Sequence, residues 1–339
     1  MIFDFSLLNI IMKKFLVITT IFNPSEAIKR FALLDDWNLV VVGDKKTPVG
    51  WNLSGVEYLS PGDQLKLGFK ISKYLPWNNY ARKMVGYLYA VRHGADLIAE
   101  SDDDNYPLPG WGKLTSCKKY DIVSGQGFVN IYNYFQDKKE LVWPRGFPLD
   151  QINKENKFNV NKGSRKIGIY QFLVNKQPDV DAIYRLTVNK EVNFKLNFIF
   201  VLDKGVICPF NSQNTFFKKE VFPLMYLPSF TTMRSTDIFR GLVAQPLMWL
   251  YDLYLAFASP TAYQERNQHN YMKDFADEIP VYLGARKVFD VVEKNLSSNK
   301  SLEDNLLFAY SALIRNGILA KEEFELLESW LEDLGNLVR

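Results

Sequence analysis

Three consecutive carboxylates, Asp102, Asp103 and Asp104, follow a short apolar segment, residues 95–99. Aspartate is disfavoured in strands and adjacent carboxylates repel one another, so a buried strand that ends this way needs a cation or several hydrogen-bond donors. In an extended segment Asp102 and Asp104 project to one side and Asp103 to the other. Two carboxylates on one side can hold a hard divalent ion, Mn²⁺ or Mg²⁺, with a phosphate completing the shell. The alternative is an acidic turn that caps a helix.

The elements that would position these carboxylates alternate along the first hundred residues. Apolar and helical patterns predict strands at 14–21, 37–44 and 95–99, with helices at 26–34 and 81–93 between them. This order indicates a mostly parallel α/β sheet, and ligands bind such sheets at the carboxyl ends of the strands. We therefore expect Thr20, Asp44 and the three aspartates to lie close together.

The later sequence is less regular. Strands are predicted at 121–125 and 196–202, and the polar, basic segment 153–165 is predicted to be a surface loop. Amphipathic helical patterns fill the chain from Pro280 onward. We expect a catalytic domain over 1–279, with a nucleotide-binding half at about 14–125 and an acceptor half at about 126–279, followed by a helical C-terminal subdomain over 280–339.

Bulk composition excludes several classes of protein. The 339 residues carry a net charge of +3, too balanced for a protein that binds nucleic acid through its phosphates. Two cysteines suggest neither a disulfide scaffold nor a cysteine zinc site, which fits a cytoplasmic setting. No GxGxxG or GxxxxGK[ST] loop occurs in the sequence, which disfavours a dinucleotide-binding fold and P-loop chemistry. The apolar segment 1–22 resembles neither a signal peptide nor a membrane span, because its charges interrupt it.

Ten short words, in this order, resemble the STELLO-type family of glycosyltransferases over about residues 14–278. They are TTIFNP at 19–24, VVGDKKTP at 41–48, PWNNYARK at 76–83, GYLYA at 86–90, DDDN at 102–105, WPRG at 143–146, VDAIYRL at 180–186, NSQNT at 211–215, TDIFRG at 236–241 and QERN at 264–267. The layout is more distantly similar to the reversibly glycosylated polypeptides, which interconvert ring forms of UDP-arabinose. The resemblance implies a GT-A-like nucleotide-diphospho-sugar transferase fold.

The function implied by the resemblance is metal-dependent transfer of a hexosyl or pentosyl group from a UDP-sugar to a glycan or polysaccharide acceptor. The cytoplasm, or the inner face of a membrane with peripheral association, would be its location. Two alternatives stay open: a nucleotide-sugar mutase in which an arginine carries the sugar, and a non-catalytic scaffold with a GT-A fold. The donor sugar, the acceptor, the stereochemistry and the oligomeric state are not given by the sequence.

The resemblance also suggests roles around the nucleotide. Asp102 and Asp104 would hold the metal as a DXD motif, and Asp103 would contact ribose or sugar hydroxyls. Asp44 and Thr20 would contact the base or ribose; the alternatives are a turn aspartate and a helix-capping threonine. Arg82 and Lys83, at the start of a helix, would face the diphosphate, or else a solvated surface.

Residues late in the chain complete the expected site. His269 would be a third metal ligand or a surface histidine, and Asp237 would be the base that deprotonates the acceptor or a helix cap. Arg145 and Arg185 would contact phosphate or sugar, or form structural ion pairs. Four tryptophans could stack on sugars or lie in the core. They are Trp51, Trp77, Trp111 and Trp143.

Overall fold

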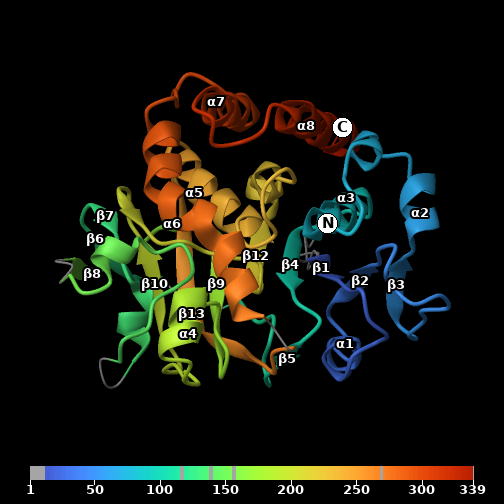
Figure 1. The fold of residues 1–339 in the computed structure, drawn as a ribbon, viewed down its shortest axis with the longest axis horizontal. Helices are drawn as coiled ribbons and strands as arrows, with labels where there is room; N and C mark the ends of the chain where they lie inside the picture. The colour runs from blue at the N-terminus through green and yellow to red at the C-terminus, as the bar shows by residue number, and fades with distance from the viewer. Residues whose placement is uncertain (1–11, 115–117, 137–139, 155–157, 268–269, 339) are drawn as a thin grey trace, which may run out of the picture.

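The computed structural model describes residues 12–338 except 115–117, 137–139, 155–157 and 268–269. Its centre is an eleven-stranded mixed sheet with the order β3-β2-β1-β4-β12-β9-β13-β10-β6-β8, with β5 paired to β13 (Figure 1). The strands of this sheet are β1 (Lys14–Thr19), β2 (Asn38–Val42), β3 (Val56–Leu59), β4 (Leu97–Ser101), β5 (Asn105–Pro107), β6 (Tyr120–Ser124), β8 (Asn159–Gly163), β9 (Lys166–Asn175), β10 (Ile199–Leu202), β12 (Asn214–Lys218) and β13 (Leu253–Gln264). The short strands β7 (Gly127–Phe128) and β11 (Val206–Ile207) form a separate pair.

The predicted α/β class is confirmed, and its parallel part is the N-terminal one. β3, β2, β1 and β4 run parallel, so their carboxyl ends share one edge of the sheet. From β12 onward the order mixes orientations: β12 is antiparallel to β4 and β9, whereas β13 is parallel to β9. The expectation of a mostly parallel sheet therefore applies only to the nucleotide-binding half.

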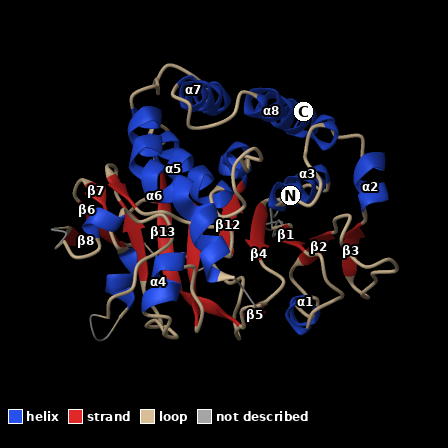
Figure 2. Cartoon of the chain, viewed as in Figure 1, coloured by secondary structure: helices blue, strands red, loops and turns tan. Residues whose placement is uncertain are grey.

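Both faces of the parallel part are buried, which explains its continuous apolar strands. Along β1, Phe15 and Val17 join one buried cluster and Leu16 and Ile18 join the other. The first cluster includes side chains of α3 (Lys83–Arg92), and the second includes side chains of α1 (Glu26–Phe31). Helices consequently lie on opposite sides of these strands (Figure 2).

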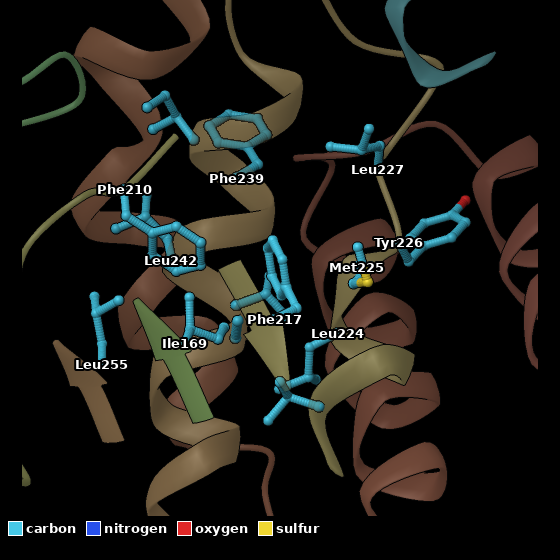
Figure 3. Close-up of a cluster of buried hydrophobic side chains, with 14 of the residues drawn as sticks. Ile169, Phe210, Phe217, Leu224, Met225, Tyr226, Leu227, Phe239, Leu242 and Leu255 are labelled. Atoms are coloured by element: carbon cyan, nitrogen blue, oxygen red, sulfur yellow. The ribbon is translucent and has the colours of Figure 1, made fainter. Parts of the chain in front are cut away.

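The larger cluster extends between the second half of the sheet and α5 (Thr236–Trp249). Phe217 from β12, Leu255 from β13 and Leu242 from α5 meet there (Figure 3). The remaining helices are α2 (Pro61–Lys66), α4 (Ala182–Thr187), α6 (Tyr271–Glu293), α7 (Leu302–Arg315) and α8 (Glu322–Val338), with short 3-10 turns at Lys70–Lys73, Tyr80–Arg82, Ile131–Phe135, Leu149–Gln151 and Lys219–Met225.

The C-terminal helices share this core. The predicted division after residue 279 falls inside α6, which begins at Tyr271 and contains Pro280. Val288 of α6, Tyr310 of α7 and Trp330 of α8 all belong to the larger buried cluster. In Figure 1, α7 and α8 run across one end of the molecule from α6 toward α3. The helical C-terminal region is therefore packed onto the rest of the described chain.

One prediction about the middle of the chain is wrong. Within the segment expected to be a surface loop, residues 159–163 form β8, an edge strand antiparallel to β6. Its side chains are almost all exposed. The strand therefore lacks the apolar alternation by which a half-buried strand is recognised in sequence, although its backbone is paired.

Candidate active site

A cavity of about 530 Å³ opens where the carboxyl ends of β1, β2 and β4 meet. One half of its wall comes from these strand ends and the turn before α3. The other half comes from the start of α5, the segment after β13 and the first turns of α6. Thr20, Asp44, Arg82, the three aspartates and Asp237 all line this cavity. The expectation that Thr20, Asp44 and the three aspartates lie close together is thus confirmed.

The aspartates sit in a turn between β4 and β5 and are not extended, so the expected alternation of their side chains is absent. Each carboxylate instead accepts hydrogen bonds from a different part of the chain. Asp102 contacts the turn before α3, Asp103 contacts the end of β1, and Asp104 contacts the segment around the end of β13. The turn therefore joins the two halves of the cavity wall.

Asp103 is fixed by the end of β1. Thr20 Oγ1 donates to its Oδ2 at 2.6 Å, and Ser25 Oγ, the N-cap of α1, donates to its carbonyl at 2.5 Å. Burial raises the pKa of Asp103 to about 6, although the Thr20 bond opposes this. Thr20 positions the aspartate turn as well as lining the cavity.

Asp102 contacts two side chains, Tyr80 in the turn before α3 and Lys83 at the start of α3. Tyr80 Oη donates to its Oδ1 at 2.8 Å, and Lys83 Nζ lies 3.6 Å from the same oxygen. Burial raises the pKa of Asp102 to about 7; Lys83 opposes this rise and Asp104 adds to it. Burial and the charge of Asp104 thus disfavour the ionised form of Asp102, and a bound cation would stabilise that form.

Asp104 faces the later segment of the chain. Gln264 Nε2 donates to its Oδ1 at 2.9 Å, and the amide of Asn267 donates to its Oδ2 at 3.3 Å. These neutral donors hold the carboxylate without cancelling its charge.

No three His, Cys, Asp or Glu side chains converge to enclose a metal ion within the part of the chain that the structure describes. The donor set at the turn still fits Mg²⁺ or Mn²⁺, because these ions are commonly held by one or two carboxylates together with water and substrate phosphates. Asp102 and Asp104 are hard oxygen donors on one turn, close enough for Asp104 to raise the pKa of Asp102. His269, the expected third ligand, lies outside the described residues.

Asp44 is more constrained than the sequence suggested. Its Oδ1 accepts the amides of Lys45 at 2.6 Å and Asn78 at 2.8 Å, and its Oδ2 accepts the amide of Asn79 at 3.2 Å. Asn78 has a positive φ of 53°, a conformation that this amide bond helps to hold. Asp44 thus shapes the turn that borders the cavity, which favours the turn role over direct contact with a base.

Arg82 and Lys83 are both buried and not on a solvated helix face. The Arg82 guanidinium donates to Gln64 Oε1 at 2.9 Å through Nε, donates to the Leu75 carbonyl, and stacks 3.7 Å from the centre of the Trp77 ring. Among the described residues no carboxylate forms a salt bridge with it. Lys83 lies below the cavity, where Nζ donates to the Ser101 carbonyl at 2.9 Å.

Asp237 is held by an arginine. Arg145 Nη1 and Nη2 donate to its two carboxylate oxygens at 3.0 and 2.9 Å, and Arg145 also pairs with Asp179 at 2.8 Å. Burial opposes ionisation of Asp237, but the charges of Arg145, Arg240 and Arg234 and the Arg145 hydrogen bonds together lower the pKa to about 2. So low a proton affinity disfavours Asp237 as a general base.

Two further arginines of the cavity wall carry their own carboxylates. Arg234 Nε donates to Glu278 Oε1 at 2.8 Å, and Arg266 Nη2 lies 3.3 Å from Asp274 Oδ2. Burial lowers the pKa of Arg266 to about 10, and the charge of Arg234 adds to this. The Arg266 guanidinium therefore remains charged at neutral pH.

The other predicted residues are mostly structural. Arg185 is buried and bonds to Gln177 and to the Pro178 carbonyl, so it does not line the cavity. Three of the four tryptophans are core residues, as the alternative reading proposed. They are Trp51, Trp111 and Trp143. Trp77 supports the Arg82 guanidinium instead of standing free for a sugar.

Sequence reasoning missed residues that complete the site. Tyr80, Ser212 and Gln264 contact Asp102, Asp237 and Asp104 respectively. Each lies in one of the ten sequence motifs that resemble the STELLO-type family. The resemblance therefore pointed to their segments but assigned these residues no role. Asp179 and Asp274, the partners of Arg145 and Arg266, stand in no such motif and gave no signal.

Helices long and apolar enough to cross a membrane are absent from the described part of the chain. A family model described as STELLO glycosyltransferases matches residues 234–338. "Probable glycosyltransferase STELLO1" of Arabidopsis thaliana is 28% identical over 345 residues, covering 95% of this chain and 44% of that protein. "Probable glycosyltransferase STELLO2" of the same plant is 27% identical with the same coverage. The chain thus spans less than half the length of the curated relatives it matches.

Among solved structures, the Mycobacterium tuberculosis glucosyl-3-phosphoglycerate synthase aligns with 81% of this chain and 80% of its own at 13% identity. The TM-score of 0.40 is too low to support an argument about the fold or the site. The alignments to the two plant proteins, by contrast, extend over 95% of this chain. They confirm the resemblance of this chain to the STELLO glycosyltransferases.

Proposed function

We propose that this protein is a metal-dependent glycosyltransferase that moves a sugar from a nucleoside-diphosphate donor, a UDP-sugar, to a glycan acceptor. The observation that carries the proposal is the turn of three aspartates at the carboxyl end of β4, in the wall of one cavity. Ligands of open α/β sheets bind at this edge. The similarity to proteins named as glycosyltransferases supplies the class of reaction.

The metal would be held by Asp102 and Asp104, with Asp103 kept by Thr20 beside the end of β1. When bound, Mn²⁺ or Mg²⁺ neutralises the diphosphate and stabilises the leaving nucleotide. Burial and mutual repulsion already raise the pKa of Asp102 to about 7, so the turn favours a cation. The protein's part is to orient Asp104 through Gln264 and the amide of Asn267.

The nucleotide would occupy the half of the cavity next to the ends of β1 and β2. Arg82 is a fixed cation there that no described carboxylate contacts, and Lys46 also lines this half. Asp44 holds the bordering turn in place through three backbone amides. A preformed wall with net positive groups beside the metal site suits a diphosphate.

The other half of the cavity suits an uncharged acceptor rich in hydroxyl groups. Its three arginines are each paired with a carboxylate of this chain: Arg145 with Asp179 and Asp237, Arg234 with Glu278, and Arg266 with Asp274. Of its remaining charges, Lys273 and Asp277 offset one another. An anionic acceptor would therefore meet balanced charge, whereas sugar hydroxyls can donate to carboxylates and accept from guanidinium groups.

The proposal is tested by incubating the protein with UDP-sugars and GDP-mannose, with Mn²⁺ or with EDTA, and by measuring nucleotide release with and without neutral oligosaccharides. Release that needs both Mn²⁺ and a neutral acceptor is expected, and Asp104→Asn should abolish it. Asp150→Asn is the matched control, because that carboxylate is exposed and, among the described residues, pairs with Lys154 and Arg286. Ring interconversion of the donor without an acceptor would indicate a mutase, and absence of nucleotide binding would indicate a scaffold.

A further inference from the structure

A continuous line of polar atoms runs from Asp102 to Asp237 at the edge of the cavity. Tyr80 Oη lies 2.8 Å from Asp102 Oδ1 and 2.7 Å from Ser212 Oγ. Ser212 Oγ lies 3.1 Å from Asp237 Oδ2. Two hydroxyl groups thus join a carboxylate of the donor half to a carboxylate of the acceptor half.

These three contacts share two hydroxyl hydrogens. Tyr80 and Ser212 each have one, and the carboxylates at the ends only accept when ionised. Lys83 Nζ donates to Tyr80 Oη at 2.5 Å, which occupies one acceptor position of that oxygen. If Tyr80 donates to Asp102 and Ser212 donates to Asp237, the contact between the two hydroxyl oxygens has no hydrogen. With Asp102 and Asp237 both ionised, as a bound cation requires of Asp102, the line is one hydrogen short, and the two carboxylates compete for the hydroxyl hydrogens.

We propose that Tyr80 and Ser212 are positioning residues that form a relay between the donor and acceptor halves. When Asp102 is occupied by a cation, the Tyr80 hydroxyl turns its hydrogen to Ser212 Oγ, and Ser212 keeps its own hydrogen on Asp237. All the hydroxyl hydrogens then point toward the acceptor half. No proton leaves its oxygen in this rearrangement, because only the two hydroxyl groups rotate. The inference rests on the proposed function, since it needs a cation at Asp102.

At the end of the relay, Asp237 bonds to a guanidinium group in the acceptor half of the cavity wall. Asp237 also accepts the amide of Ser212 at 3.2 Å and both Nη groups of Arg145. Arg145 in turn binds Asp179, which lines the cavity. A stronger bond from Ser212 to Asp237 would steady this arrangement, so occupation of the donor half would prepare the acceptor half.

The relay predicts a specific dependence of Mn²⁺ affinity on Ser212. In Ser212→Ala the Tyr80 hydrogen has no alternative acceptor in the line, so it stays on Asp102 and competes with the cation. Mn²⁺ affinity should fall roughly threefold to tenfold, the range of one net hydrogen bond. In Tyr80→Phe no hydroxyl competes for Asp102, so adding Ser212→Ala should change the affinity less than about twofold.

The experiment is calorimetric titration of Mn²⁺ into the wild-type protein, the two single variants, the double variant and Ser329→Ala. Ser329 is a buried serine of α8 that donates to the Glu325 carbonyl, so its variant controls for loss of a buried hydroxyl. Circular dichroism melting checks that each variant folds. An equal loss from Ser212→Ala in both backgrounds, or no loss in either, would overturn the relay. If wild-type protein does not bind Mn²⁺, the proposed metal site fails first and the relay fails with it.

Discussion

The ion pair between Glu100 and Arg240 provides a direct test of how the aspartate turn is supported. Glu100 is in β4, two residues before Asp102, and its side chain is fully buried. Arg240 of α5 donates to its two oxygens at 3.0 and 2.5 Å, and Tyr87 Oη donates to it as well. The pair therefore fastens the end of β4 to α5.

Glu100→Gln keeps the shape of the side chain but leaves a buried arginine without its counter-charge. The Gln amide would also direct hydrogens toward the guanidinium group. Removing one partner of a buried ion pair costs about 3–5 kcal/mol, so we expect the free energy of unfolding to fall by about that amount. Glu100→Leu with Arg240→Met removes both charges and should cost less than the single change.

Urea denaturation followed by fluorescence gives the free energies of unfolding. Glu26→Gln is the control, because Glu26 pairs with Lys29 on the exposed surface and its loss should have no measurable effect. A loss of less than about 1 kcal/mol in Glu100→Gln, or a double variant less stable than the single one, would refute the reasoning.

Three further predictions concern the buried carboxylate of Glu323, the cavity residue Arg82 and the aspartate turn. Glu323→Gln should cost about 1–3 kcal/mol in urea denaturation, because the carboxylate accepts Tyr226 Oη and the amides of Ser229 and Phe230. Burial raises the pKa of Glu323, so the wild type should lose stability relative to this variant as pH rises through that value; a constant difference would contradict this. Arg82→Lys should cost about 1–2 kcal/mol in the same assay, since lysine cannot reproduce the fork on Gln64 or the stacking on Trp77; an unchanged midpoint would argue against it. Burial raises the pKa of Asp102 to about 7, so protons compete with Mn²⁺ for this ligand below that value. Calorimetry should show Mn²⁺ affinity rising roughly twentyfold between about pH 5.5 and pH 7.5, and a flat profile would exclude Asp102 as a ligand.

The parallel half of the fold was predictable because its signals are local. Continuous apolar runs gave β1, β2 and β4, and Ser25 and Gly94 marked the start of α1 and the end of α3. The second half was not predictable in the same way. β12 is antiparallel to β4 and β9 whereas β13 is parallel to β9, and no short pattern specifies these partners or their orientations.

The same distinction holds for the site. Strand ends converge by topology, so Thr20, Asp44 and the aspartates could be placed together from sequence. The charge state of Asp237 could not be predicted from sequence, because it depends on contact with Arg145, which lies 92 residues earlier in the chain. Asp44 shows the same limit, since its bonds to the amides of Asn78 and Asn79 arise only in the folded chain.

The central claim is that the aspartate turn holds a divalent cation that binds the diphosphate of the donor. Calorimetric titration of UDP into the protein, with and without Mn²⁺, tests it most directly, in the wild type, Asp104→Asn and the control Asp150→Asn. We predict that UDP binding requires Mn²⁺ and weakens at least about tenfold in Asp104→Asn but not in Asp150→Asn. UDP binding of equal affinity without metal, or unchanged in Asp104→Asn, would contradict the claim.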